Sequence, residues 1–333
     1  FRIWRGTYDR GAAAEIATVV LAFAIVAITI ERIARGRARF GQSGGAAAGM
    51  DRRTLTGRKA AGATALCGLV VTAAFVGPVV QLIVWAIREQ RSDRGTPLVD
   101  EYPEYLLNTL QLVAVTVLVC VGVAIIVVNA ERFGSPRITR AATRAASIGY
   151  AVPGPVVGIG VLLAVVAADS ALETIGLDLP GAVATGSFLV LAYAYAIRFL
   201  APGLAAVEPG IGQVPEEMTA SARSLGASPS QTMRRVHLPL SRAAIISAAL
   251  LVGVDALKEL PIVLLLRPFG FDTLPVWVYN LASESRFQQA ALPALSIIAV
   301  ALIPVALLSR QLDRIPTAAE PTPAEPTAAE VTS

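Results

Sequence analysis

The sequence predicts an all-α membrane protein, a polytopic helical bundle of about seven transmembrane helices. Of its 333 residues, 55% are hydrophobic and only 16% are charged, whereas a soluble globular protein carries about 25% charged residues. Long apolar runs recur along the chain, and none alternates apolar and polar residues as the strands of a membrane barrel do. Each run is therefore expected to form a helix, because backbone groups in lipid must bond to one another.

Apolar runs of about 20 residues, enough to cross a bilayer, occur in every part of the chain before the tail. The expected helices are residues 12–30, 61–87, 106–130, 145–168, 181–201, 243–266 and 290–309. A long basic linker follows the first helix, which suggests one helix left over from a preceding unit and then a complete six-helix unit. The expected divisions are residues 1–40 with the leftover helix, 41–59 as a basic cytoplasmic linker, 60–310 as the six-helix unit and 311–333 as a disordered tail.

The connecting segments differ in charge, which predicts the orientation of the chain. Segments 31–60, 131–144 and 206–242 are rich in Arg and Lys, whereas 169–180 has acids and no base. Basic connecting segments stay in the cytoplasm. The chain is therefore expected in the cytoplasmic (inner) membrane with Phe1 outside and Ser333 inside, although a cluster of three arginines in segment 88–105 does not fit this alternation.

Composition and motifs argue against other classes of protein. A net charge of +4 is too small to indicate a nucleic-acid partner, and Cys67 and Cys120 both lie in apolar runs. The single histidine, His237, cannot form a His-rich metal site. The sequence has no phosphate-binding GxxxxGK[ST] loop, catalytic triad or zinc-ligand spacing, so neither an enzyme nor a metal site is expected. The glycine pairs 158/160 and 210/212 are interpreted as loops or close helix packing.

A long basic segment, residues 214–242, lies between the fifth and sixth expected helices. Ala220 to Leu225 favours a helix, and Gly226 is a typical left-handed helix stop. Ser228-Pro229 is typical of the start of a second short helix, which Leu238-Pro239 should end. We call this segment the knob, and we expect its two short helices to pass force to a cytoplasmic partner.

The knob resembles a loop of ABC-type importer permeases, which reads Glu-Ala-Ala, three residues, Gly, nine residues and Ile-x-Leu-Pro. The matching positions are Ala220, Ser221, Ala222, Gly226, Val236, Leu238 and Pro239. The spacing from Gly to Leu-Pro agrees in full, but Ala220 replaces the Glu, whose role would pass to Glu216 or Glu217. The resemblance implies that the knob is a coupling element on a dimeric ATP-binding subunit, that ATP binds there, and that this chain binds no cofactor.

The sixth expected helix contains the charged residues Asp255, Lys258 and Glu259, followed by Pro261, which should kink or break the helix. Charges inside a membrane are costly and usually face a cavity or one another. Two interpretations stay open. The group forms a gate or pathway element near the outer mouth, or it is a self-neutralising cluster that holds helices together.

The stretch from Lys258 to Leu274, with Arg267, is similar to the ferric-iron branch of these permeases, although Ile262-Val263 and Pro275 depart from its pattern. The resemblance implies a family core at 106–309 and a first permease half that ends in residues 1–40. It also implies ferric iron as substrate, delivered by an extracytoplasmic binding protein. Phosphonate, thiamine, sulfate or molybdate are alternative substrates, and an ion-coupled secondary transporter with Asp255, Lys258 and Glu259 as relay is an alternative mechanism.

Overall fold

The computed structural model describes residues 55–92, 101–133, 152–174 and 186–313, together with the isolated residues 18, 19, 22, 26, 143, 146, 149 and 150. Within these ranges every regular element is a helix. Five described helices are long and apolar enough to span a membrane, or six if one bent pair counts as a span. The all-α prediction is confirmed, whereas the expected helix 12–30 and tail 311–333 lie almost entirely outside the described residues.

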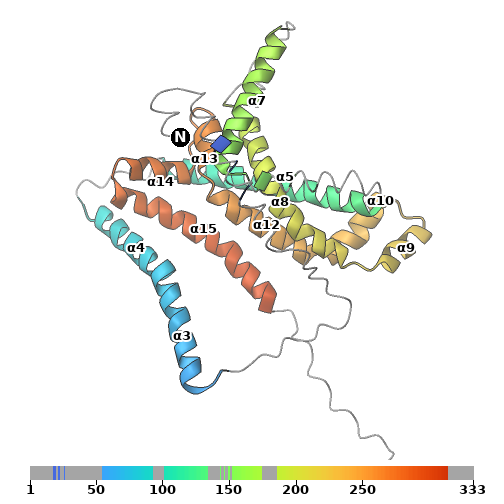
Figure 1. The fold of residues 1–333 in the computed structure, drawn as a ribbon, viewed down its shortest axis with the longest axis horizontal. Helices are drawn as coiled ribbons and strands as arrows, with labels where there is room; N and C mark the ends of the chain where they lie inside the picture. The colour runs from blue at the N-terminus through green and yellow to red at the C-terminus, as the bar shows by residue number, and fades with distance from the viewer. Residues whose placement is uncertain are drawn as a thin grey trace, which may run out of the picture.

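The first described helix is a long arm that leaves the rest of the bundle. It consists of α3 (Gly57–Val71), the wider turn η1 (Thr72–Val76) and α4 (Gly77–Gln90). Pro78 lacks an N–H group and would clash with the preceding turn of a regular helix, and the wider turn just before it accommodates the proline. α3 has no buried residue and extends away from the bundle, while α4 packs against α15 (Figure 1).

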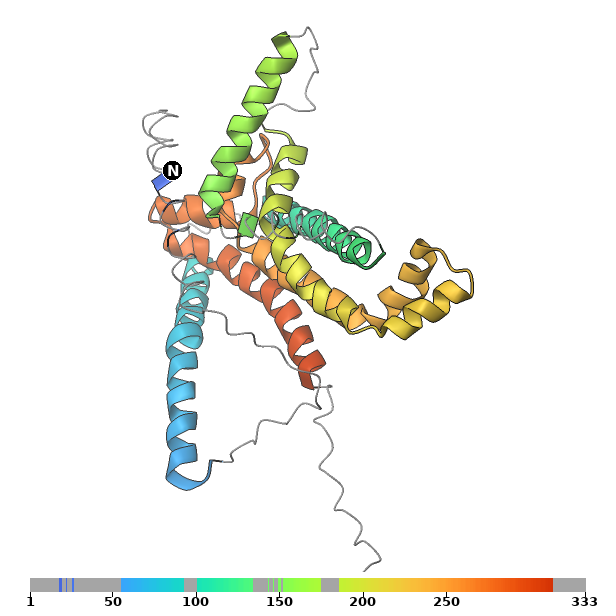
Figure 2. The ribbon, with the colours of Figure 1, turned by 45° about the vertical axis from the view of Figure 1, so that its right-hand side comes forward.

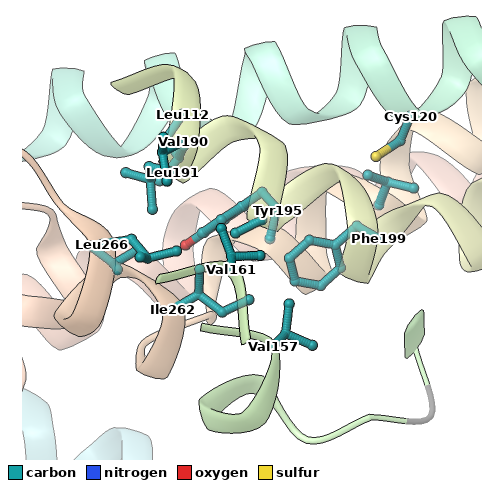
Figure 3. Packing of buried hydrophobic residues seen from close by; sticks show 14 of the residues in the cluster. Leu112, Cys120, Val157, Val161, Val190, Leu191, Tyr195, Phe199, Ile262 and Leu266 are labelled. Atoms are coloured by element: carbon teal, nitrogen blue, oxygen red, sulfur yellow. The ribbon is translucent and has the colours of Figure 1, made fainter. Parts of the chain in front are cut away.

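Three helices form the interior of the bundle. α8 (Phe188–Gly212) packs along both α5 (Tyr102–Phe133) and α12 (Arg242–Leu257). Leu112 and Cys120 of α5 meet Leu191, Tyr195 and Phe199 of α8 in the larger core cluster (Figure 3). A second cluster continues toward the knob. It contains Val121, Ala124, Val128, Leu204, Val207, Ile211 and Ala248.

The remaining helices cover one end and one side of this interior. α7 (Gly154–Thr174) contacts α13 (Pro261–Leu266) and α8, and then projects away from the bundle, as both ribbon views show (Figures 1 and 2). α14 (Leu274–Ser283) leads into α15 (Phe287–Asp313), and these two helices pack on each other.

Several expected boundaries change in the structure. The expected helix 243–266 is broken into α12 and α13 around Lys258–Leu260, α7 begins at Gly154 rather than at 145, and α14 was not expected at all. α8 continues to Gly212 despite its internal prolines Pro202 and Pro209. Its last turns bury Val207 and Ile211 in the second cluster, and this burial offsets the hydrogen bonds that the prolines remove.

Close packing between α8 and α12 requires a glycine at position 210. A Cβ atom added there would lie 2.1 Å from the Cβ atom of Ala244, whereas one added at Gly212 would meet nothing within 4 Å. In the other pair, Gly158 approaches Leu265 and Gly160 approaches nothing. The close-packing interpretation is thus confirmed for one glycine of each pair.

We predict that Gly210→Ala lowers the stability of the protein by about 1–3 kcal/mol, because α8 and α12 must move apart. Gly212→Ala is the matched control and should change stability by less than about 1 kcal/mol. Thermal unfolding of the purified chain in mild detergent measures both. Equal stability of the two variants would show that the contact between α8 and α12 is not tight.

Candidate functional site

The knob consists of two short helical arms joined by a tight turn. α9 (Glu216–Ser224) leads to Gly226, whose φ of 82° is the left-handed conformation predicted for it. Ser228 caps α10 (Pro229–Thr232) with a complete capping box, and Pro229 occupies the first turn. The predicted helix stop and the predicted second helix start are therefore confirmed.

The second arm ends later than predicted. It continues from α10 through the wider turn η2 (Met233–His237) into α11 (Leu238–Leu240), so Leu238-Pro239 does not end it. The wider turn lets the backbone N–H of Leu238 donate to the carbonyl of Met233. Pro239 is therefore accommodated in the same way as Pro78, which follows the wider turn η1. The chain then turns by 78° at Ser241 into α12.

The tip of the knob exposes an apolar side chain beside the left-handed Gly226. Leu225 is 89% exposed, next to Gly226. The other motif residues lie behind this tip: Ala220, Ser221 and Pro239 are exposed, and Ala222, Val236 and Leu238 are half-buried. Glu216 and Glu217 are exposed in the first turn of α9, so either carboxylate is accessible to a partner.

A buried histidine ties both arms of the knob to the bundle. His237 is fully buried, with its Nδ1 atom 2.6 Å from Oδ1 of Asn129 on α5 and its Nε2 atom 3.1 Å from Oγ1 of Thr219 on α9. The Asn129 amide donates to the carbonyl of Ile125, so its oxygen faces His237 and accepts from Nδ1–H. Sequence analysis missed this anchor. A lone histidine inside the knob and an asparagine at the end of an apolar run were its only signals.

Arg132 in the last turn of α5 fixes the end of α8. Its guanidinium donates to the carbonyl of Ile211, at 2.7 Å, and to that of Val214. Helix ends leave carbonyls without partners, and Ser241 bonds a further one, that of Gly210, at 3.0 Å. Arg132, His237 and Ser241 therefore join the knob, α5 and α8 into one unit.

A second group of polar residues surrounds the break between α12 and α13. Oε2 of Glu259 accepts from Nε of Arg198 at 3.0 Å, and Oε1 accepts from the backbone N–H of Ile262 at 3.4 Å. The hydroxyl of Tyr195 donates to the carbonyl of Glu259. Pro261 begins α13, so the predicted break at this proline is confirmed. Glu259 is 7% exposed and supplies bonds to groups that the interrupted helix leaves unpaired.

Two further helices approach this carboxylate closely. Arg198 of α8, which sequence analysis did not include in the site, also donates to the carbonyl of Val152 at 2.6 Å. Gly154 at the start of α7 leaves room for Glu259, because a Cβ atom there would lie 2.6 Å from Oε1. Glu259 therefore joins α7, α8, α12 and α13, which favours the helix-holding interpretation for this residue.

The other predicted charges form separate pairs. Nζ of Lys258 lies 2.7 Å from Oδ1 of Asp255, and Tyr150 donates to the second oxygen of Asp255 at 3.3 Å. The Lys258 side chain is 68% exposed, unlike that of Glu259. Arg267 pairs with Asp272 across the turn between α13 and α14. The structure therefore does not gather the predicted charges into one relay.

The described helices include several that are long and apolar enough to span a membrane, and comparison with known proteins identifies the family. Residues 121–315 match the binding-protein-dependent transport system inner membrane components. The chain belongs to this family, the inner-membrane permeases of ABC importers. This assignment confirms a multi-pass transport subunit rather than an enzyme, and the matched region overlaps most of the expected core 106–309.

Individual permease proteins also share sequence similarity with part of the chain. PhnV of Salmonella typhimurium and of Salmonella paratyphi A, named as 2-aminoethylphosphonate transport system permease proteins, are 28% identical over 151 residues. This match covers 45% of the present chain and 52% of PhnV, so the chain spans about half the length of the curated relatives it matches.

Two solved structures share the fold. A bacterial alginate ABC transporter in complex with an alginate pentasaccharide-bound periplasmic protein superimposes with a TM-score of 0.61 at 17% identity. The superposition covers 77% of the present chain and 95% of the alginate transporter chain. A second structure of a bacterial ABC transporter that imports alginate gives a TM-score of 0.57 at 17% identity, covering 77% of this chain and 96% of its own. At this identity the likeness concerns the fold alone.

We predict that Glu259→Ala lowers stability by about 3–5 kcal/mol, because it leaves the partly buried Arg198 without its ion-pair partner. Glu284→Ala is the control, because Glu284 and its ion-pair partner Arg286 are both exposed, and it should cost less than about 1 kcal/mol. Adding Arg198→Leu to Glu259→Ala should recover part of the loss. Thermal unfolding of the four proteins tests this, and similar melting points for Glu259→Ala and Glu284→Ala would contradict it.

We also predict that acidification loosens the knob. Burial and the nearby Arg132 charge lower the pKa of His237 below its usual 6.5, so the folded knob favours the neutral ring. As pH falls below 6.5 the unfolded segment gains a proton that the folded one resists. The stabilisation from the neutral His237 ring is complete above this pH. It is lost progressively as the pH falls toward the lowered pKa of His237 in the folded knob.

Hydrogen exchange of residues 216–240, corrected for the intrinsic effect of pH, measures this loss. Protection should fall on acidification in the wild type and stay level in His237→Gln. Equal pH dependence in the two proteins would assign the effect to another group.

Proposed function

We propose that this permease subunit couples ATP hydrolysis on a separate dimeric subunit to import, through the knob at residues 214–242. The observation that carries the proposal is the form of the knob. It presents the apolar Leu225 beside Gly226 at its tip, and His237 and Arg132 anchor its base. An exposed apolar tip on a firmly held element is suited to a groove in a partner.

Force on the knob has a short route into the bundle. His237 contacts Asn129 of α5, Arg132 of the same helix bonds the end of α8, and α11 leads directly into α12. A push on the tip would therefore move α5, α8 and the start of α12 together. Pro261 and the break before α13 offer a hinge beyond them. Such rocking would open the transport path alternately to each side of the membrane.

The sequence supports an orientation with the knob in the cytoplasm, Phe1 outside and Ser333 inside. In this arrangement ATP binds only to the partner subunit, and an extracytoplasmic binding protein meets the opposite end of the bundle. The periplasmic protein named in the alginate transporter structure supports such a partner. Residues 1–40 would be the end of a preceding permease half.

For the substrate we retain ferric iron, because Lys258 to Leu274 is similar to the ferric-iron branch. Among the described residues no group of three or more His, Cys, Asp or Glu could hold a metal ion. We therefore place iron selection in the binding protein. The Asp255–Lys258 pair, with its exposed lysine, is our candidate for the transport pathway. We assign Arg267, which pairs with Asp272, a role in stabilising the turn between α13 and α14.

A second candidate substrate is 2-aminoethylphosphonate, which the relatives named PhnV favour. Uptake of radiolabelled ferric iron and of 2-aminoethylphosphonate by cells that express the whole system would decide between them. Iron uptake that is lost on deletion of the permease supports the first substrate. Dependence of phosphonate uptake alone on the permease would replace iron with phosphonate.

The coupling role predicts a graded effect of substitutions at Gly226. No atom would meet an added Cβ there, so only the left-handed backbone matters. Gly226→Val should cost about 1–3 kcal/mol at the tip and uncouple transport. Gly226→Asn, which tolerates this conformation, should stay active. Co-purification with the ATP-binding subunit and substrate-stimulated ATPase activity measure the effect. Full coupling in Gly226→Val would refute the role of the tip.

A further inference from the structure

A polar pocket lies at the end of the bundle away from the knob. It has a volume of about 330 Å³ and opens where α4 ends and α15 begins. In Figures 1 and 2 this end holds α14 and the start of α15, and α9 and α10 lie at the other end. The lining residues are Trp85, Glu89, Ser285, Arg286, Phe287, Gln288 and Gln289. None of them takes part in the knob or the helix break.

One side of the pocket is built to accept hydrogen bonds from a cation. Glu89 is only 8% exposed, and its carboxylate has no hydrogen bond or ion pair to another described residue. The side-chain oxygen of Gln289 is also buried, without a partner in the part of the chain that the structure describes. A buried charge and a buried acceptor both need donors, and a primary ammonium supplies three of them.

The other side of the pocket is positive. Arg286 is partly exposed, and its guanidinium pairs with the still more exposed Glu284 at 3.1 Å. α15, a helix of 27 residues, begins at Phe287 with its N-terminus at the pocket. Its unpaired N–H groups and dipole favour an anion, as does the nearby guanidinium. The pocket therefore offers an acceptor site for an ammonium next to a donor site for a phosphate.

The surroundings of the pocket are those of a membrane interface. It sits at the ends of two helices that are able to span a membrane, Gly57–Gln90 and Phe287–Leu307. The rings of Trp85 and Phe287 lie 6.1 Å apart at its wall, and aromatic side chains concentrate at the level of lipid headgroups. Exposed apolar residues of α4, among them Val80 and Ile83, continue away from it along the helix.

We propose that this pocket binds the headgroup of a zwitterionic phospholipid with a primary ammonium, of the phosphatidylethanolamine type. Glu89 and Gln289 accept from the ammonium, Arg286 and the α15 N-terminus hold the phosphate, and the acyl chains lie along α4. A trimethylated headgroup cannot donate to Gln289 and binds less well. The proposal does not rest on the coupling role of the knob.

Native mass spectrometry of the full chain tests the site after incubation with equal amounts of phosphatidylethanolamine, phosphatidylcholine and phosphatidylglycerol. Wild type should retain phosphatidylethanolamine about tenfold or more over the other two. Glu89→Gln, which keeps the shape, should abolish this preference. Glu208→Gln, which alters an exposed acid on α8, is the matched control and should keep it. Equal retention of the three lipids by wild type, or an unchanged preference in Glu89→Gln, would overturn the proposal.

Further measurements address folding and the source of the headgroup chemistry. Circular dichroism checks that Glu89→Gln is folded, and Gln289→Leu gives an independent variant that should lose the preference over phosphatidylcholine. Free 2-aminoethylphosphonate carries the same ammonium and a similar anion. It should not displace the lipid at millimolar concentration. Displacement that depends on Glu89 would assign the pocket to a soluble zwitterion and overturn the lipid.

Discussion

The constraint on which this structure depends is that backbone groups freed where a packed helix breaks or ends must find partners within the protein. The chain leaves regular helix at the break before Pro261 and at the turn around Ser241. At the break, the carboxylate of Glu259 bonds the N–H of Ile262 and pairs with Arg198. At the turn, Ser241 and Arg132 bond carbonyls at the end of α8. At both irregular points the freed backbone groups are therefore bonded within the protein, so the chain can change direction there without leaving these groups unpaired.

Near these two points, residues that hold the bundle together can be distinguished from residues that face outward. Glu259 and His237 are buried and hold helices together, whereas Lys258 and Leu225 are exposed and available to other molecules. Among the described residues, the charges predicted from the sequence fall into separate pairs. The proposed coupling through the knob does not depend on a relay of charges.

Much of the fold followed from the sequence, because apolar length and local turn chemistry are properties of short segments. Most of the long described helices, the stop at Gly226 and the start at Ser228-Pro229 were predicted from such segments, whereas α14 was not. The anchor of His237 was not, because Asn129 and Thr219 reach it only through tertiary packing. Arg198 was missed for the same reason, and the end of the knob was misplaced because Pro239 follows a wider turn. The roles of the coupling motif and of the intramembrane charges stay predictions, and the contacts that these residues make within the protein came from the fold.

The central claim is that the tip of the knob docks on the ATP-binding subunit. Site-directed cross-linking tests it most directly, with a cysteine at Leu225 in a Cys67→Ser background, since Cys67 is exposed and Cys120 is buried. Ser283, exposed at the end of α14, is the control position. The account predicts that Leu225→Cys forms a link to the ATP-binding subunit whose yield changes with ATP, and that Ser283→Cys forms none. A link from position 283, or none from position 225, would contradict it.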